Sequence, residues 1–243
     1  MVSENPRLVC QVFSMPKHGN SNEEYEDACA VNAVQGRFAI ADGAAESSFA
    51  ALWARLLVDE FVKPQTALAW SEWLPGLQER WAAAVDHQQL PWYAETKVQQ
   101  GAFATFLGVV IEPNCWRAVA VGDSCLFHLR DGNLRHAFPV QRSQEFTTAP
   151  WLIGSRGFNS TSMMKKEMRL EDDWRPGDRL WLMTDALAQW FLQKLEEDRQ
   201  SWRDLAGLLE ELDPAAEFAA LVNWSRECHS LRNDDVTWLT VAE

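Results

Sequence analysis

The chain has 243 residues, enough for one large domain. Its composition, with 47% hydrophobic and 23% charged residues, is ordinary for a soluble globular protein. Its formal net charge of −13 disfavours nucleic acid and anionic membranes as partners, although metal cations would let an acidic chain handle a phosphorylated substrate. No apolar run is long enough for a membrane span, and the N-terminus lacks the layout of a signal peptide. The five cysteines are scattered and include no C-x-x-C pair, so they fit neither a disulfide framework nor a zinc knuckle. We therefore expect a cytoplasmic protein without a membrane segment.

The first part of the chain predicts three strands followed by two helices. Apolar runs predict strands near residues 8–14, 27–33 and 37–41. An apolar stripe then predicts a helix over about 46–62, and a tryptophan-rich stripe predicts a helical region over about 66–87, which Pro75-Gly76 can break. The helical spacing of these tryptophans favours a place in the core over a ligand platform.

The rest of the chain is rich in strands and ends with helices and a closing strand. The segments "GAFATFLGVVIE", "WRAVAVG", "SCLFHLRDG" and "NLRHAFPV" predict strands, with a hairpin turn at the Asp-Gly of "RDGN". Residues 139–163 lack periodicity and are expected to form a surface excursion. Further strands are expected near 164–171 and 179–184, then helices including 201–211 and 214–228, and a last strand in "DDVTWLTVA". Without an internal repeat or linker, we expect one domain over 1–243, an α+β layered sandwich of antiparallel sheets with helices outside.

Five predicted strands carry a carboxylate at one end. The first follows "FAIA" as Asp42-Gly43, a dipeptide that is also a common turn without any function. The others are Asp27 after Glu26, Asp123 after Gly122, Asp185, and the pair Asp234-Asp235. Converging carboxylates repel one another unless cations neutralise them, and oxygen donors select hard ions such as Mg²⁺ or Mn²⁺. Two such ions about 4 Å apart suit the hydrolysis of a phosphate ester.

The ordered segments "EDACAV", "FAIADGA", "GAFATFLGVVI", "AVGDSCLFHLRDGNL", "GDRLWLMTDAL" and "NDDVTWLTV" resemble the metal-dependent PPM (type 2C) Ser/Thr protein phosphatase family. The resemblance extends from about residue 8 to residue 242 and keeps the family's order of motifs. It implies a four-layer αββα sandwich of two antiparallel sheets flanked by helices. It also implies hydrolysis of phosphoserine or phosphothreonine on proteins by a water activated by two Mn²⁺ or Mg²⁺ ions, without a covalent intermediate.

The resemblance also implies the roles of individual residues. Asp42 would bridge the two metals, and the Gly43 carbonyl would bind the second. Asp185 and Asp234 would complete the first metal site, so that these three aspartates are the expected catalytic set.

Three further carboxylates belong to the same implied site. Glu26 and Asp27 would hold metal-bound waters or act as ligands. Asp123, together with the aspartate at 185, would hold a third metal, but Gln189 stands where family members often carry a carboxylate, which weakens the case for that ion.

Several positions depart from the family pattern. Asn22 replaces an arginine that often binds the substrate phosphate, and Lys17 or His18 is a candidate substitute, with ordinary surface charge as the other interpretation. Ala44 replaces a candidate general-acid histidine, and Asp235 replaces an asparagine beside Asp234. These changes leave open an alternative function, a phosphatase-like regulatory or scaffolding module with weak or no activity.

Other catalytic constellations find little support. The five histidines show no H-x-H, H-E-x-x-H or G-N-H spacing, and His128 is expected to be a structural or surface residue on its strand. Ser124 lacks a nucleophile elbow, and "LIGSRG" lacks the Lys-Ser/Thr of a P-loop. The substrate is expected to be a phosphoprotein, and analogy alone points to a cognate Ser/Thr kinase as the partner system.

Overall fold

A computed structural model describes residues 7–86, 98–156, 166–198 and 202–243. Its strands form two five-stranded antiparallel sheets, with the orders β1-β12-β11-β7-β8 and β10-β6-β5-β3-β2, and one small two-stranded sheet of β4 and β9. The first sheet contains β1 (Val9–Met15), β7 (Cys125–Arg130), β8 (Asn133–Phe138), β11 (Arg179–Met183) and β12 (Val236–Ala242). The second contains β2 (Ala28–Asn32), β3 (Arg37–Ala41), β5 (Phe106–Glu112), β6 (Cys115–Val121) and β10 (Met168–Asp173). The small sheet pairs β4 (Phe103–Ala104) with β9 (Ile153–Gly154).

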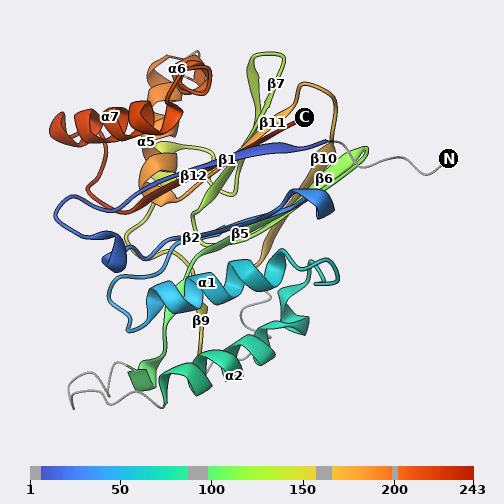
Figure 1. The fold of residues 1–243 in the computed structure, drawn as a ribbon, viewed down its shortest axis with the longest axis vertical. Helices are drawn as coiled ribbons and strands as arrows, with labels where there is room; N and C mark the ends of the chain where they lie inside the picture. Colours follow the sequence, from blue (N-terminus) through green and yellow to red (C-terminus); the bar gives the residue numbers. More distant parts are fainter. Residues whose placement is uncertain (1–6, 87–97, 157–165, 199–201) are drawn as a thin grey trace.

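Helices cover the outer face of each large sheet (Figure 1). On the side of β2 and β3, α1 (Ala50–Phe61) packs against the sheet and α2 (Leu74–Val85) packs against α1. The other sheet is covered by α5 (Asp185–Glu197), α6 (Trp202–Leu208) and α7 (Pro214–Glu227). Short 3₁₀ helices are η1 (Asn22–Glu24), η2 (Ala33–Gln35), η3 (Trp70–Glu72) and η4 (Ser143–Glu145). The expected α+β sandwich with four layers in the order αββα is confirmed.

The strand β3 shows why an uninterrupted apolar run was needed. Every residue of β3 is buried, since one face of the strand looks toward the opposite sheet and the other toward α1. Phe38 and Ile40 lie in the core between the sheets, whereas Ala39 and Ala41 lie in the core below α1. The small alanines let the helix approach the sheet closely, and on the neighbouring strand a Cβ at Gly108 would lie 2.6 Å from the Phe61 ring. This tight packing fixes the end of β3, where Asp42 follows.

Some predicted boundaries need correction. The helix expected over 46–62 begins at Ala50, and Pro75 lies in the first turn of α2, so this proline marks the start of a helix rather than a break. The segment 139–163 is not simply a surface excursion, because Ile153 is fully buried and β9 pairs with β4; residues 157–163 lie outside the described residues. In the described residues, we find no helix with the length and apolar character that crossing a membrane requires.

Candidate active site

The Asp42-Gly43 turn is held from both sides by backbone contacts. The Asp42 carbonyl accepts a hydrogen bond from the Thr105 N–H at 2.8 Å, and the Gly43 N–H donates to the Glu26 carbonyl at 3.3 Å. A Cβ at Gly43 would lie 2.8 Å from the Glu26 carbonyl oxygen and 3.0 Å from Ala50, so a side chain at this position would displace the backbone. The turn therefore needs glycine for a close approach of chain segments, and it presents the Asp42 carboxylate in a fixed position.

Asp27 lies opposite Asp42 at the ends of neighbouring strands. Ala28 pairs with Ala41 in the β2–β3 ladder, so one further step of this register brings Asp27 and Asp42 to facing positions. Oδ2 of Asp27 accepts hydrogen bonds from the hydroxyls of Thr184 at 2.9 Å and Thr237 at 2.7 Å, which come from the other sheet. Burial raises the pKa of Asp27 to about 8 against the lowering effect of these hydroxyls. The two threonines therefore anchor one carboxylate oxygen across the gap between the sheets.

Asp123 follows β6 and is almost fully buried. Gly122 has a φ of +95° and its hydrogen faces Thr105, where a Cβ would lie 2.7 Å from a methyl carbon, so only glycine suits this turn. Both carboxylate oxygens of Asp123 lack a hydrogen-bond partner within the described residues. Burial, and next the charge of Asp185, raise the pKa of Asp123 to about 7. An ionised group in this position needs a counter-charge.

Asp185 and Asp234 come from the other sheet. Asp185 is the first residue of α5, and Thr184 alone separates it from the end of β11 at Met183. Its Oδ1 accepts a hydrogen bond from the Ala186 N–H at 2.5 Å. The start of a helix favours a negative charge at this position. Asp234 lies two residues before β12, and burial together with the charge of Asp185 raises its pKa.

The five aspartates meet around Asp42, where the two sheets face one another. Burial raises the pKa of Asp42 well above its ordinary value, and the charges of four other aspartates add to this effect. These four are Asp27, Asp185, Asp234 and Asp123. Glu26 belongs to the same group, because the charges of Asp235 and Asp234 act on it. Burial raises the pKa of Glu26 to about 6; Lys17 lowers this pKa, and the two aspartates raise it further. The fold thus brings together all of the carboxylates that the sequence analysis selected.

The chemistry of these donors fits hard divalent cations. All of the side-chain donors are carboxylate oxygens, and three of those oxygens, Oδ1 of Asp27 and both of Asp123, are buried without a hydrogen-bond partner in the described residues. The raised pKa values of Asp42, Asp123 and Asp234 share two causes, first burial and then the negative charge of neighbouring carboxylates. Mg²⁺ and Mn²⁺ prefer such oxygen ligands and would remove this repulsion.

Arg232 is a residue of this site that sequence reasoning missed. Its guanidinium forms ion pairs with Asp185 and, at 3.2 Å between Nη2 and Oδ2, with Asp234. These two carboxylates and that of Asp42 raise the pKa of Arg232 against the effect of burial. Proximity to Asp234 in the sequence was the only available signal, and it does not reveal the contact with Asp185.

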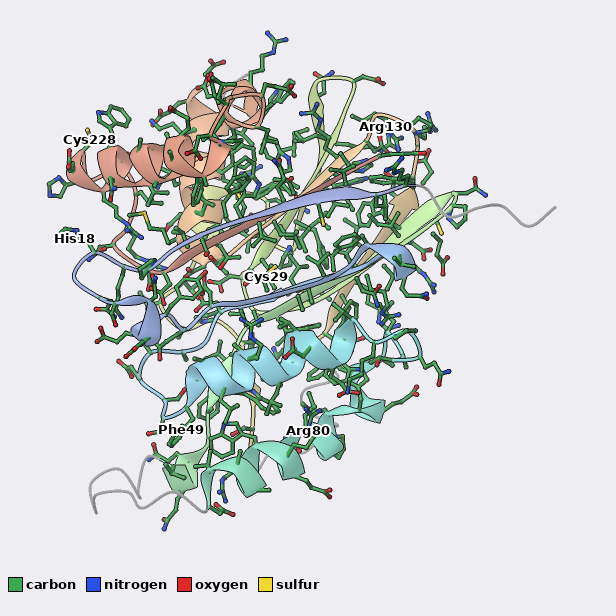
Figure 2. The ribbon with its side chains drawn as sticks, viewed as in Figure 1. His18, Cys29, Phe49, Arg80, Arg130 and Cys228 are labelled. Carbon is green, nitrogen blue, oxygen red and sulfur yellow. The ribbon has the colours of Figure 1, made fainter. Side chains whose placement is uncertain are left out.

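The two candidate phosphate ligands, Lys17 and His18, differ in their relation to the site. Both lie on the loop between β1 and β2, where Figure 2 labels His18, and this loop lies beside the α7–β12 loop. Lys17 is close enough to Glu26 to lower the pKa of that carboxyl against the larger effect of burial. His18 is exposed and is held through its backbone N–H, which donates to Asn233 Oδ1 at 2.7 Å. Across the described residues, neither side chain forms an ion pair with a carboxylate of the site.

Asp235 has a structural task in this arrangement. Its Oδ1 accepts a hydrogen bond from the Lys17 N–H at 2.8 Å, and its Oδ2 accepts one from the Glu26 N–H at 2.7 Å. Both oxygens therefore tie the β1–β2 loop to the start of β12. The extra negative charge that the sequence places beside Asp234 is thus used to hold backbone amides.

The other departures from the family pattern also have visible surroundings. Ala44 uses its backbone N–H to bond the Phe103 carbonyl at 2.8 Å, and its methyl side chain supplies no acid. Gln189 donates from Nε2 to the Ser143 carbonyl at 3.3 Å. Asn22 is exposed in η1.

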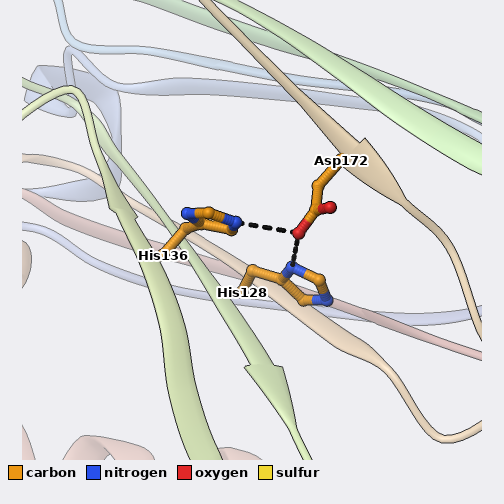
Figure 3. Close-up of side chains that lie close together, drawn as sticks. All are labelled: His128, His136 and Asp172. Carbon is orange, nitrogen blue, oxygen red and sulfur yellow. Dashed lines mark hydrogen bonds and ion pairs between the residues drawn. The ribbon is translucent and has the colours of Figure 1, made fainter.

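A second group of potential metal ligands lies where β7 and the edge strands β8 and β10 of the two sheets meet. Figure 3 shows its three side chains. His128 and His136 are register partners on β7 and β8, and Asp172 comes from β10 of the other sheet. Their ligand atoms lie within 4.8 Å of one another. Sequence reasoning missed this group because its members meet only through strand pairing and sheet packing. His128 is a structural residue and is fully buried.

Ion pairs and hydrogen bonds already occupy Asp172 in this second group. Oδ2 of Asp172 accepts hydrogen bonds from His136 Nε2 at 2.8 Å and from Arg135 Nε at 2.5 Å. The bond from Arg135, together with those from the Asp173 backbone and His136, keeps the pKa of Asp172 far below its usual range. Nearby, Arg130 on β7 makes two hydrogen bonds to the buried Asp178, each 2.6 Å long. A metal ion would compete with Arg135 for the same oxygen, so we interpret the group as a charged link between the two sheets.

Comparisons with known proteins agree with the fold. The sequence matches the family model described as Protein phosphatase 2C over residues 16–225. A comparison with curated proteins gave no significant match. Among solved structures, the fold is similar to the catalytic domain of the serine threonine protein phosphatase PstP in complex with 2 manganese ions, with 17% identity, a TM-score of 0.62 and 97% of each chain covered.

Two further structures show the same likeness. The serine/threonine phosphatase PstP/Ppp of Mycobacterium tuberculosis has 18% identity and a TM-score of 0.57, with 97% of this chain and 98% of that chain covered. PppA, a key regulatory component of T6SS in Pseudomonas aeruginosa, has 18% identity and a TM-score of 0.59, with 98% of each chain covered. With a family match that spans most of its length and a fold shared across nearly the whole chain, this protein belongs to the protein phosphatase 2C family.

Proposed function

We propose that this protein is a metal-dependent phosphoprotein phosphatase that hydrolyses phosphoserine and phosphothreonine. The observation that carries the proposal is the convergence of five aspartates from both sheets, with buried carboxylate oxygens that have no hydrogen-bond partner among the described residues. Family membership supports the same reaction class. One manganese-bound structure with the same fold supports the choice of ion.

We propose that two Mn²⁺ or Mg²⁺ ions bind between the sheets. Asp42 would contact both ions, the Gly43 carbonyl would complete one site, and Asp185 and Asp234 would complete the other. Glu26, Asp27 and Asp123 would serve as ligands or orient bound waters, and Asp123 would be the centre of any third site. Such ions lower the pKa of a bound water and neutralise charge on phosphoryl oxygens.

The chain's own residues would position this chemistry. Thr184 and Thr237 hold Asp27 in one orientation through two hydroxyl hydrogen bonds. The helix start at Asp185 and the glycine turn at Gly43 fix two more oxygen donors. Ala44 has no proton to give, so protonation of the leaving group would depend on solvent or on a neighbouring carboxyl.

The substrate would be a phosphoprotein, and a Ser/Thr kinase that acts on the same target would be its natural counterpart. The alternative of a weak or inactive regulatory module finds no specific support in the geometry. The altered loop at Ala44 removes a side chain but leaves Asp42, Asp185 and Asp234 together.

The test is the hydrolysis of phosphoserine, phosphothreonine and phosphotyrosine peptides with and without Mn²⁺. We expect turnover of the first two that requires the metal and falls by about a thousandfold or more in Asp42→Asn, since loss of a shared ligand disrupts both sites. Asp59→Asn, on the exposed part of α1, is the matched control and should keep full activity. Mn²⁺ binding without turnover of any peptide would contradict the proposal and favour the regulatory module.

A further inference from the structure

We propose that Arg232 is the residue that binds the phosphate group of the substrate. This inference rests on the proposed phosphatase function. A phosphate dianion approaching five aspartates meets strong repulsion, and bound metal ions offset only part of it if other carboxylates remain ionised nearby. A guanidinium group at the rim of the site would supply a further positive charge and two parallel N–H donors, the geometry that suits a phosphate.

The position of Arg232 meets this requirement. It lies on the short connection between α7 and β12, and its guanidinium reaches Asp185 and Asp234, which belong to different elements of the site. Among the lysines and arginines in the described parts of the chain, Arg232 is the one that forms ion pairs with these carboxylates. The position expected to carry a phosphate ligand holds the exposed Asn22 instead.

Arg232 is also free to change partners. Its side chain is 45% exposed, and ion pairs with this much solvent contact contribute little to stability. Its neighbour Arg226 is different, because it donates to the Pro16 carbonyl at 2.9 Å and the Asp234 carbonyl at 2.5 Å and so fixes the loop. Arg226 therefore supports the backbone that carries Arg232, while the guanidinium of Arg232 can turn toward a ligand once cations neutralise Asp185 and Asp234.

A groove beside Arg232 offers room for the protein segment that carries the phosphate. It has a volume of about 640 Å³ and lies between α5 and the loop after α7. Its lining includes Ala186, the neighbour of Asp185, as well as Trp190, Lys194 and Arg232. The groove thus runs along α5, where Glu196 and Glu197 also line it, and reaches Arg232 and the residue that follows Asp185. A phosphorylated peptide is the occupant that fits a groove ending at a cation beside a metal-binding site.

The test compares Arg232→Gln and Arg232→Lys with Arg80→Gln. Arg80 on α2 forms a similar ion pair, with Glu60 at 2.9 Å and 51% exposure of its side chain, so it is a matched control. Mn²⁺ affinity is measured by calorimetry, and the affinity for inorganic phosphate is then measured with Mn²⁺ present. Steady-state KM and kcat on a phosphoserine peptide complete the comparison, and thermal unfolding verifies that each variant is folded.

We expect Arg232→Gln to weaken phosphate binding and to raise KM by about 10- to 100-fold, the loss that follows from removing a charge-assisted pair of hydrogen bonds. Arg232→Lys should recover part of this loss, and Arg80→Gln should change neither value. Mn²⁺ should bind Arg232→Gln at least as tightly as the unaltered protein, because a competing cation is gone.

Unchanged phosphate affinity in a folded Arg232→Gln variant would overturn the inference. So would weaker Mn²⁺ binding that accounts for the whole loss, since Arg232 would then only shape the metal site. Failure of the proposed function has a different signature, because the unaltered protein would then show no Mn²⁺ binding or no Mn²⁺-dependent turnover.

Discussion

Asp123→Asn provides a quantitative test of the charge crowding in the site. Asp123 is 5% exposed, both of its oxygens lack a hydrogen-bond partner in the described residues, and its pKa is about 7 in the folded protein. In the unfolded chain its pKa returns to about 3.8. A difference of this size means that ionising Asp123 in the metal-free protein costs about 4 kcal/mol of folding free energy.

The sign of this effect follows from the raised pKa. Asp123 binds a proton more tightly in the folded state than in the unfolded state. The stability that this proton contributes is therefore fully present below about pH 4 and is lost as the pH rises through about 7. Asparagine has nearly the same shape and does not ionise. In metal-free protein, the variant should therefore be more stable than the unaltered chain by about 4 kcal/mol near pH 8.5 and by only about 1–2 kcal/mol near pH 5.

Urea unfolding of metal-free protein at these two pH values measures both differences. Asp59→Asn on the exposed part of α1 is the control, and it should change stability by less than about 0.5 kcal/mol at either pH. Equal effects of Asp123→Asn at the two pH values would refute the reasoning, because the carboxylate would then have a compensating partner. With Mn²⁺ added the order should reverse if Asp123 contributes to binding, since a ligand that binds only the folded state stabilises it.

Three other substitutions test the parts that shape the site. Gly43→Ala would place a methyl group 2.8 Å from the Glu26 carbonyl oxygen, so we expect a loss of about 1–3 kcal/mol in urea unfolding and weaker Mn²⁺ binding by calorimetry; unchanged values would mean that the turn can yield. Arg130→Gln removes the arginine partner of Asp178, which is 1% exposed, so stability should fall by about 3–5 kcal/mol while Mn²⁺ affinity stays the same, and a fall in that affinity would link the two regions. Asp235→Ala leaves two backbone N–H groups without their acceptor, so we expect stability to fall by about 1–3 kcal/mol for each group. We also expect Mn²⁺ affinity to fall, and full Mn²⁺ affinity would show that the β1–β2 loop does not position Glu26.

Local patterns predicted the layers of the fold and the candidate ligands. The run ending at Asp42 is continuously apolar because β3 is buried on both faces, and this burial is what made the strand and its end recognisable. The carboxylates at strand ends could be selected for the same reason. Their convergence on Asp42 required knowledge of how the strands are ordered within the two sheets.

Contacts between distant segments could not be predicted in this way. Asp234 and Asp235 are neighbours in the sequence, yet one lies among the aspartates and the other holds backbone amides of a loop more than 200 residues away. The pairing of Arg232 with Asp185, and of His136 with Asp172, likewise depends on which segments become neighbours after folding. Ile153 was assigned to an exposed segment because a strand of two residues has no measurable periodicity.

The most direct test of the central claim is an anomalous diffraction measurement on crystals of this protein grown with Mn²⁺. We predict two strong peaks beside the Asp42 carboxylate, within coordination distance of Asp185 and Asp234. No peak at Asp42, or Mn²⁺ found only among His128, His136 and Asp172, would contradict the assignment of the acidic site as the metal centre of a phosphatase.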